Sequence, residues 1–145
     1  MLQLALMVLV GLSALTGVYW SESVAGVLSV VGLALILAGL VLLVLAGISL
    51  SLARSTTVFP RPRESATVAD GGVYRRVRHP IYGAVILVAA GVSLAESPLG
   101  LIPTALLAVV FDLKVRVEEG WLQERLPGYA RYRARTPRRF IPGVY

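Results

Sequence analysis

The residues best suited to chemistry lie in one short polar segment, residues 71–82, which leads into an uncharged stretch. This segment contains three arginines, two tyrosines, a proline and the only histidine of the chain. Pro80 suits the first position of a helix, and it biases His79 towards an extended backbone. The pattern therefore predicts that Arg78 and His79 lie at the entrance of an apolar helix, where a binding or catalytic site is expected.

A second charged segment, residues 112–119, follows the last long apolar stretch. Asp112 and Arg116 are four residues apart, as are Lys114 and Glu118, so each pair shares a helix face. Alternating charges at the mouth of a membrane helix are suited to a zwitterionic ligand. A solvated surface helix shows the same pattern, and the residues alone leave both interpretations open.

The composition excludes several kinds of site. The chain has no cysteine and one histidine, so we expect no disulfide, no cysteine nucleophile and no metal site. Its 57% hydrophobic and 15% charged residues indicate a membrane protein, since soluble domains have about 45–50% and about 25%. All fourteen Lys and Arg residues lie in two blocks, residues 54–78 and 114–139. This grouping is typical of membrane topology, and we expect no nucleic-acid partner.

The uncharged stretches predict an all-α integral membrane protein with four transmembrane helices. Their approximate bounds are residues 2–19, 24–53, 80–95 and 99–113. The first stretch has no basic n-region, so it is interpreted as a retained span in preference to a cleaved signal peptide. The chain is expected to form one domain, residues 1–145, with a connector, 54–79, and a tail, 114–145.

The last predicted span is expected to continue beyond the membrane. Leu113, Val117 and Trp121 extend an apolar stripe at four-residue spacing, which predicts an amphipathic extension to about residue 126. A short helix, Tyr129–Arg135, is expected to follow and to end before Pro137. The aromatic residues of this tail are consistent with interfacial anchors.

Two glycines of the second predicted span suggest a helix-packing face. Gly32 and Gly39 are seven residues apart and lie on nearly one face, which would allow another helix to approach closely. Glycine is also common in membrane helices in general, and the spacing alone does not distinguish the two explanations.

The distribution of charge predicts the orientation in the membrane. The loop between the first two spans carries only Glu22, and the loop between the last two carries only Glu96. Both basic blocks fall on the opposite side, which the positive-inside rule assigns to the cytoplasm. We therefore expect a multi-pass protein of the cell (inner or plasma) membrane with both termini in the cytoplasm.

Several motifs occur together in an order typical of one enzyme family. They are Gly72-Val73-Tyr74, Arg78-His79-Pro80 with Tyr82, Glu118-Glu119, Tyr129 with Tyr132, and Pro137 with Phe140-Ile141-Pro142. From about residue 30 to the C-terminus the chain resembles the isoprenylcysteine carboxyl methyltransferase family, whose superfamily includes membrane phospholipid N-methyltransferases. The resemblance implies an integral membrane enzyme that binds S-adenosylmethionine at the cytoplasmic face without a Rossmann fold.

The resemblance also implies roles for individual residues. The expected cofactor-binding residues are Thr67, Val68, Tyr74, Arg78, His79, Pro80, Ile81, Tyr82 and Glu118. Glu118 would take the ammonium group of the cofactor, while Thr67 and Val68 correspond by position only. Lys114 would meet the substrate, although it stands where prenylcysteine methyltransferases have arginine and lacks the two-pronged geometry of that side chain. No catalytic residue is assigned, and the role of Glu119 is left open.

Methyl transfer from a sulfonium fits this set of residues. The reaction is one in-line displacement, so the protein must mainly position the donor and the acceptor and keep water out. The expected acceptor is lipophilic, a prenylcysteine-type carboxylate or a related lipid, with O-, N- and S-methylation all left open. Membrane lipids are expected partners, and the question of a homo-oligomer is left open.

Two other functions agree with parts of the sequence. Membrane sterol-type reductases, which use NADPH, resemble the same family in their C-terminal helices, although they are generally much longer. A non-enzymatic protein that grips anionic lipid through its basic blocks is the second alternative. In that case Arg75 and Arg76 should matter as much as His79 and Tyr82.

Overall fold

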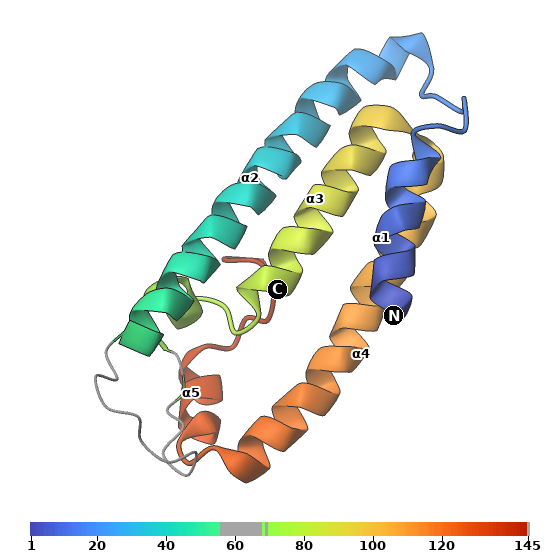
Figure 1. Ribbon diagram of the computed structural model, residues 1–145. Helices are drawn as coiled ribbons and strands as arrows, with labels where there is room; N and C mark the ends of the chain where they lie inside the picture. The colour runs from blue at the N-terminus through green and yellow to red at the C-terminus, as the bar shows by residue number, and fades with distance from the viewer. Residues whose placement is uncertain (56–67, 69, 145) are drawn as a thin grey trace.

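The computed structural model describes residues 1–55, 68 and 70–144, and every regular element within them is helical (Figure 1). The elements are α1 (Leu2–Ser13), α2 (Glu22–Ser55), η2 (Gly72–Arg75, a 3-10 turn), α3 (Pro80–Glu96), η3 (Pro98–Gly100, a 3-10 turn), α4 (Leu101–Arg125) and α5 (Tyr129–Arg135). The predicted all-α class is therefore confirmed. α3 begins at Pro80 as expected, α4 continues past residue 113 without a break, and α5 has the predicted bounds.

Within the described residues, two segments are long and apolar enough to cross a membrane. They are Glu22–Leu52, within α2, and Pro98–Arg125, which comprises η3 and α4. α2 has 34 residues, and at about 1.5 Å per residue it is longer than the roughly 30 Å hydrocarbon core of a bilayer. The apolar helices α1 and α3 are shorter. Four spans and the orientation of the termini therefore stay predictions.

The helix α1 ends at Ser13, before residue 19, where the first span was expected to end. The Ser13 hydroxyl donates to the carbonyl of Val10, and the Thr16 hydroxyl donates to the carbonyl of Ser13, both at 2.7 Å. Gly17 then takes a φ of 72°, in the left-handed region where a helix cannot continue. The 12 residues of α1 extend about 18 Å, roughly 60% of the hydrocarbon core of a bilayer.

Small residues allow α2 and α3 to pack closely along most of the length of α3 (Figure 1). A Cβ at Gly32 would lie 2.5 Å from the carbonyl oxygen of Gly91, and one at Gly39 would lie 2.8 Å from that of Ala84. Both distances are shorter than van der Waals contact, so any side chain there would push the helices apart. The packing face suggested by Gly32 and Gly39 is thus confirmed.

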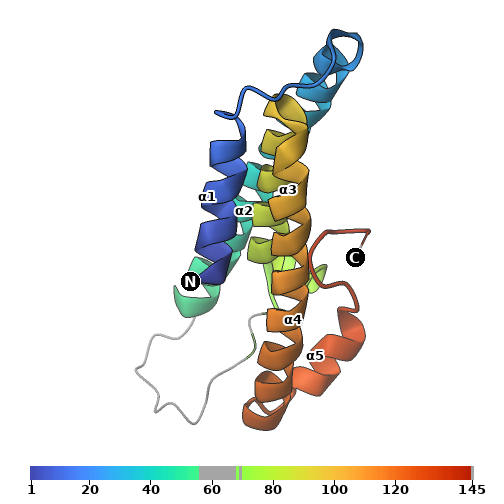
Figure 2. The same cartoon turned by 90° about the vertical axis from the view of Figure 1, so that its right-hand side faces the viewer.

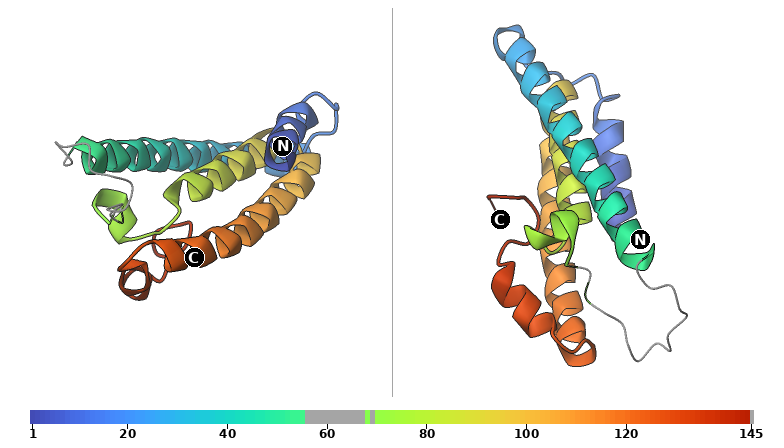
Figure 3. Two further views of the ribbon diagram at one scale, coloured as in Figure 1. Left: turned by 60° about the horizontal axis from the view of Figure 1, so that its bottom comes forward. Right: turned by 90° about the vertical axis from the view of Figure 1, so that its left-hand side faces the viewer.

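α3 lies between α2 and α4 (Figure 3), and α1 packs against α4 and α3. The core of this bundle is formed by Leu6, Val10, Ala89, Leu107, Phe111, Val115 and Phe140. Phe140 belongs to the C-terminal tail, so the core already includes the segment that follows α5. Exposed leucine and valine side chains cover the outer faces of α1 and α2, as expected for helices that face lipid.

The C-terminal tail folds back onto the start of α3, on the side of α4 away from α1 (Figure 2). The N–H groups of Arg78 and His79 donate to the carbonyls of Arg138 and Arg139 at 3.1 and 2.8 Å. Gly83 allows this approach, since a Cβ there would overlap the backbone of the tail at residue 140. The tail therefore holds the segment before α3 in place.

Candidate functional site

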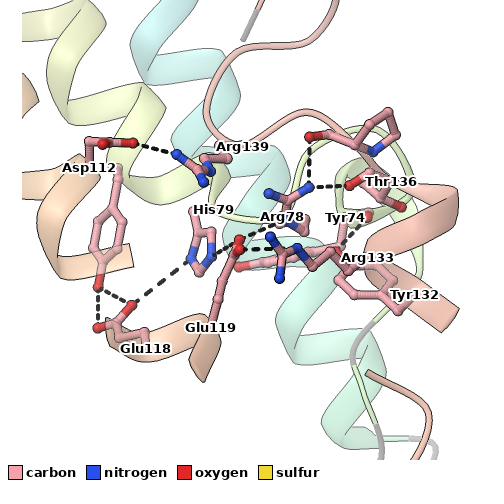
Figure 4. A network of polar contacts seen from close by, with 12 residues as sticks. Tyr74, Arg78, His79, Asp112, Glu118, Glu119, Tyr132, Arg133, Thr136 and Arg139 are labelled. Atoms are coloured by element: carbon pink, nitrogen blue, oxygen red, sulfur yellow. Dashed lines mark hydrogen bonds and ion pairs between the residues drawn. The ribbon is translucent and has the colours of Figure 1, made fainter. Parts of the chain in front are cut away.

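The two charged segments singled out in the sequence meet at one end of the bundle (Figure 4). His79 Nε2 lies 3.2 Å from Glu119 Oε1, and His79 Nδ1 lies 4.0 Å from Glu118 Oε2. His79 is the residue before α3, and the acid pair lies on the part of α4 that extends beyond the predicted span. The convergence of α3 and α4 thus brings the single imidazole of the chain against both carboxylates.

Glu119 is the buried centre of the charged network, with 3% of its surface exposed. Its Oε1 accepts a hydrogen bond from Arg78 Nε at 2.6 Å, and its Oε2 lies 3.6 Å from Arg133 Nε. Arg78 Nη1 also donates to the carbonyls of residues 136 and 137, at 2.6 and 2.7 Å. These contacts join α4, α5, the tail and the entrance of α3, so Arg78 and Glu119 are suited to hold the site together.

The buried face of α4 explains why Glu119 is inside. Its buried side chains follow each other at four-residue spacing: Leu107, Phe111, Val115 and Glu119. The apolar stripe noted in the sequence lies on the opposite, more exposed part of the helix, since each of its side chains is more than half exposed: Leu113, Val117 and Trp121. The spacing of Glu119 after the buried stripe is the signal that identifies it as the inward member of the acid pair.

Glu118, with 30% of its side chain exposed, is held from the α3 side by Tyr82. The Tyr82 hydroxyl donates to Glu118 Oε1 at 2.9 Å. The Tyr82 ring stacks on His79 and Phe111, with centroids 5.7 and 4.7 Å apart. Tyr82 therefore fixes the direction of the Glu118 carboxylate while one side of that carboxylate stays accessible.

Lys114, the predicted substrate-binding residue, lies next to this pair. Its Nζ is 3.7 Å from Glu118 Oε1 and 5.1 Å from the centre of the Tyr82 ring. It also donates to Oε1 of Gln3, at the start of α1, at 3.4 Å. The ammonium of Lys114 is thus partly neutralised by Glu118 and lies between α1 and α4.

A cavity of about 550 Å³ opens beside His79 and Glu118, within the roughly 300–1,000 Å³ usual for small-molecule sites. Its walls come from the end of the connector, the start of α3, the second half of α4, and α5. The lining residues are Val68, Tyr74, Arg78, His79, Glu118, Trp121, Leu122, Arg125, Leu126, Tyr129 and Tyr132. Five of these were predicted from the resemblance, and the residues from Trp121 onward were not.

Tyr129 carries a feature that points to a ligand. It is 3% exposed, and its hydroxyl has no hydrogen-bond partner among the residues that the structure describes. Buried polar groups without a partner are rare and call for an explanation such as a bound molecule. Burial also raises the pKa of Tyr129 to about 12, so the group is a neutral donor and acceptor at the wall of the cavity.

Tyr132 is the second tyrosine of the cavity wall, and its hydroxyl is used within the protein. It donates to the backbone carbonyl of Tyr74 at 2.8 Å, which joins α5 to η2. The spacing of Tyr129 and Tyr132 puts both rings on one face of a helix, and this was the available sequence signal for α5 as a cavity wall. It was interpreted as an interfacial pattern.

The remaining predicted residues do not line the cavity. Pro80 is buried as the first residue of α3, and Ile81 is exposed. Tyr82 reaches the site through Glu118, and Lys114 lies beside them. Thr67 lies outside the described residues.

Burial favours the neutral form of the His79 imidazole at pH 7. Burial lowers its pKa from the usual 6.5, and although the carboxylates of Glu119 and Glu118 oppose this effect, Arg78 adds to it. The carboxylate of Glu119 can only accept a hydrogen bond from His79 Nε2. The neutral ring of His79 therefore carries its proton on Nε2 and leaves Nδ1 as an acceptor. The site therefore presents a neutral base and a carboxylate, which suits a cationic ligand.

The family model described as phospholipid methyltransferase matches residues 27–127 of the chain. This range covers most of α2, all of α3 and α4, and the acid pair. No curated protein and no solved structure matches the chain. The resemblance to the superfamily of membrane methyltransferases is confirmed by this match.

Proposed function

Because the chain belongs to the phospholipid methyltransferase family, we propose that it transfers a methyl group from S-adenosylmethionine to a lipid at the cytoplasmic face of a membrane. Family membership supports methyl transfer to a lipid-type acceptor. The observation that supports this cofactor is the cavity lined by the carboxylate of Glu118, the imidazole of His79 and the hydroxyl of Tyr129. That hydroxyl has no hydrogen-bond partner among the described residues.

The donor groups of the cavity fit the cofactor. S-adenosylmethionine carries an ammonium, a carboxylate, a sulfonium and an adenine. Glu118 is suited to the ammonium and Arg125 to the carboxylate, since both line the cavity. The faces of Trp121 and Tyr74 offer stacking and cation–π surfaces to the flat base and to the sulfonium. No described residue of the protein uses the hydrogen-bonding capacity of the Tyr129 hydroxyl.

The residues of the chain act mainly by positioning. The bound cofactor supplies a methyl group on a positively charged sulfur. Tyr82 orients Glu118 through its hydroxyl, and the buried Arg78–Glu119 pair fixes the ring of His79. In its neutral form His79 would add no positive charge to a site that holds a sulfonium. Holding donor and acceptor in a reactive geometry is worth up to about 7–11 kcal/mol in the best model systems.

We assign the acceptor to the side of Glu118 that faces Lys114. Lys114 and Gln3 lie between α1 and α4, next to helix faces whose apolar side chains are exposed. A lipid can enter there from the bilayer while the polar cofactor enters from the cytosol. Membership in the phospholipid methyltransferase family favours a phospholipid as the acceptor over a prenylcysteine.

Binding of S-adenosylhomocysteine, the product form of the cofactor, tests the proposal directly. Isothermal titration of the detergent-purified chain should show binding of S-adenosylhomocysteine and none of NADPH. His79→Ala should abolish this binding and Glu118→Gln should weaken it by about tenfold or more, while the protein stays folded. The paired variant Arg75→Gln, Arg76→Gln is the control, because both arginines are exposed and lie outside the cavity. NADPH binding in place of S-adenosylhomocysteine would support a reductase instead.

The acceptor is identified by a second experiment. The purified protein is incubated with a native lipid extract and S-adenosylmethionine carrying a labelled methyl group, and the lipids are analysed by mass spectrometry. A labelled phospholipid supports the assignment, and a labelled prenyl compound would replace it. No labelled product, together with no binding of S-adenosylhomocysteine, would support the non-enzymatic alternative.

A further inference from the structure

A second hollow adjoins the charged network and shares Arg78 with the cavity described above. It is a groove of about 1000 Å³ between α4, α5 and the C-terminal tail. Its lining residues are Arg78, Arg116, Gln123, Ala130, Arg133, Ala134, Pro137, Arg138, Arg139 and Val144. Arg78 lines both hollows, so the groove adjoins the proposed cofactor cavity without being part of it.

The groove carries an excess of positive charge. Five of its lining residues are arginines. Asp112 pairs with Arg116 and Arg139 at 2.7 and 2.6 Å, and Glu119 is the acid next to the other pair, Arg78 and Arg133. Among the described residues, five guanidinium groups therefore line the groove and two carboxylates pair with them.

Arg138 adds a further positive charge to the groove. Its side chain has no acidic partner among the residues that the structure describes. Planar guanidinium groups are the side chains best suited to the oxygens of a phosphate. The groove thus has the chemistry of a phosphate-binding site.

An exposed apolar stripe on α4 ends at this groove. Four exposed side chains follow each other at alternating four- and three-residue spacing, so they form one ridge along the helix: Ile102, Leu106, Val109 and Leu113. The next residue of the same ridge is Arg116, which lines the groove. An apolar track that runs into a cationic hollow matches a lipid with its chains along the helix and its headgroup at the end.

The groove also lies at the depth expected for a headgroup. Arg78 precedes the first residue of α3 by two positions, and Arg138 and Arg139 are hydrogen-bonded to the backbone of residues 78–79. If α3 begins where the chain enters the bilayer, the groove is level with the phosphates of the cytoplasmic leaflet. Val144, at its rim, is exposed and is suited to the same interface.

We propose that this groove binds the phosphate headgroup of an anionic phospholipid, with the acyl chains of that lipid along the α4 ridge. The site is separate from the proposed cofactor cavity, and it does not depend on the proposed methyl transfer. A free phosphate shares the headgroup chemistry, but it makes no use of the apolar ridge.

The test measures lipid binding to the full chain in detergent by native mass spectrometry. Dioleoyl phosphatidylglycerol is compared with dioleoyl phosphatidylcholine, which has the same chains and no net charge. We expect at least tenfold tighter binding of the anionic lipid. The variant Arg116→Gln, Arg138→Gln should lose most of this preference, since one charge near an anionic lipid surface is worth about fivefold in affinity.

Arg75→Gln, Arg76→Gln is the matched control, because it removes the same charge from exposed residues outside the groove. It should keep the preference within about threefold of the unchanged protein. An equal loss in both double variants would mean diffuse electrostatic attraction and would overturn the site. Retained preference in the groove variant would overturn it as well. Circular dichroism of each variant confirms that the helices are intact.

A third measurement distinguishes a phospholipid headgroup from a soluble phosphate as the ligand of the groove. Glycerol 3-phosphate has the headgroup chemistry without the chains, and it should compete only at concentrations far above those of the lipid. Competition at equal concentration would assign the groove to a soluble phosphate and contradict the proposal. Titration of S-adenosylhomocysteine in the same preparations tests the two proposals separately. If binding of S-adenosylhomocysteine is lost while the preference for the anionic lipid is intact, the result concerns the cofactor cavity alone.

Discussion

The two neighbouring glutamates of α4 should respond in opposite ways to the same substitution. Glu119 is buried against Arg78 at 2.6 Å, whereas Glu118 is partly exposed at the cavity. Replacing either by glutamine removes one charge and changes the shape of the side chain very little. We expect Glu119→Gln to unfold more easily and Glu118→Gln to lose ligand binding.

The magnitude for Glu119 follows from its partners. Breaking a buried ion pair by removing one partner costs about 3–5 kcal/mol, because the other charge is left buried. Arg78 keeps two backbone carbonyls at 2.6 and 2.7 Å, so we expect the lower end, about 3 kcal/mol. At about 2–4 °C per kcal/mol, this lowers the Tm by roughly 6–12 °C.

For Glu118→Gln the expected change is in ligand affinity and not in the stability of the fold. A hydrogen bond to a charged group contributes about 1.5–3 kcal/mol, so loss of the carboxylate should weaken S-adenosylhomocysteine binding by roughly 10- to 150-fold. The Tm of the free protein should change little, because the carboxylate is partly solvated and its contacts with Tyr82 and Lys114 lie near the surface.

Thermal unfolding in detergent, followed by tryptophan fluorescence without ligand, and isothermal titration with S-adenosylhomocysteine provide both measurements. A Tm of Glu119→Gln within about 2 °C of the unchanged protein would contradict the reading of Glu119 as the buried anchor, since even 1 kcal/mol should be visible. Unchanged affinity in Glu118→Gln would remove that residue from the proposed cofactor site.

Three further predictions follow from the same geometry. Burial lowers the pKa of His79 in the folded protein, so the unfolded chain takes up the proton first as the pH falls below 6.5. The free energy of unfolding should therefore decrease over that pH range, whereas above pH 6.5 the ring is neutral in both states. His79→Asn should reduce the pH dependence of the Tm. Tyr129→Phe removes a hydroxyl without a described partner, so titration should show S-adenosylhomocysteine bound about three- to tenfold more weakly while the Tm is unchanged or higher; a lower Tm with unchanged affinity would mean that the hydroxyl serves the fold. Gly39→Ala places a Cβ 2.8 Å from the carbonyl oxygen of Ala84, so it should cost about 1–3 kcal/mol and lower the Tm by several degrees. Gly47→Ala is the control and should leave the Tm unchanged, because its Cβ meets nothing within 4 Å.

The local features of the chain were predictable from its sequence. Proline at the first helical position set the start of α3 at Pro80, and the break at Pro127-Gly128 with Pro137 set the bounds of α5. The seven-residue spacing of Gly32 and Gly39 suggested a packing face, and the structure shows α3 packed against it. Each of these depends on the backbone within a few residues, and such rules need no knowledge of the distant chain.

Only the tertiary structure decided which polar groups are buried and what they contact. Glu118 and Glu119 are adjacent and chemically identical, yet the return of the tail and the crossing of α4 put one against Arg78 and leave the other at a cavity. The Tyr129 hydroxyl, which has no hydrogen-bond partner among the described residues, likewise owes its surroundings to segments far along the chain. Burial and pairing are properties of packed surfaces, because desolvation and hydrogen-bond partners are supplied by segments that the local sequence does not contain.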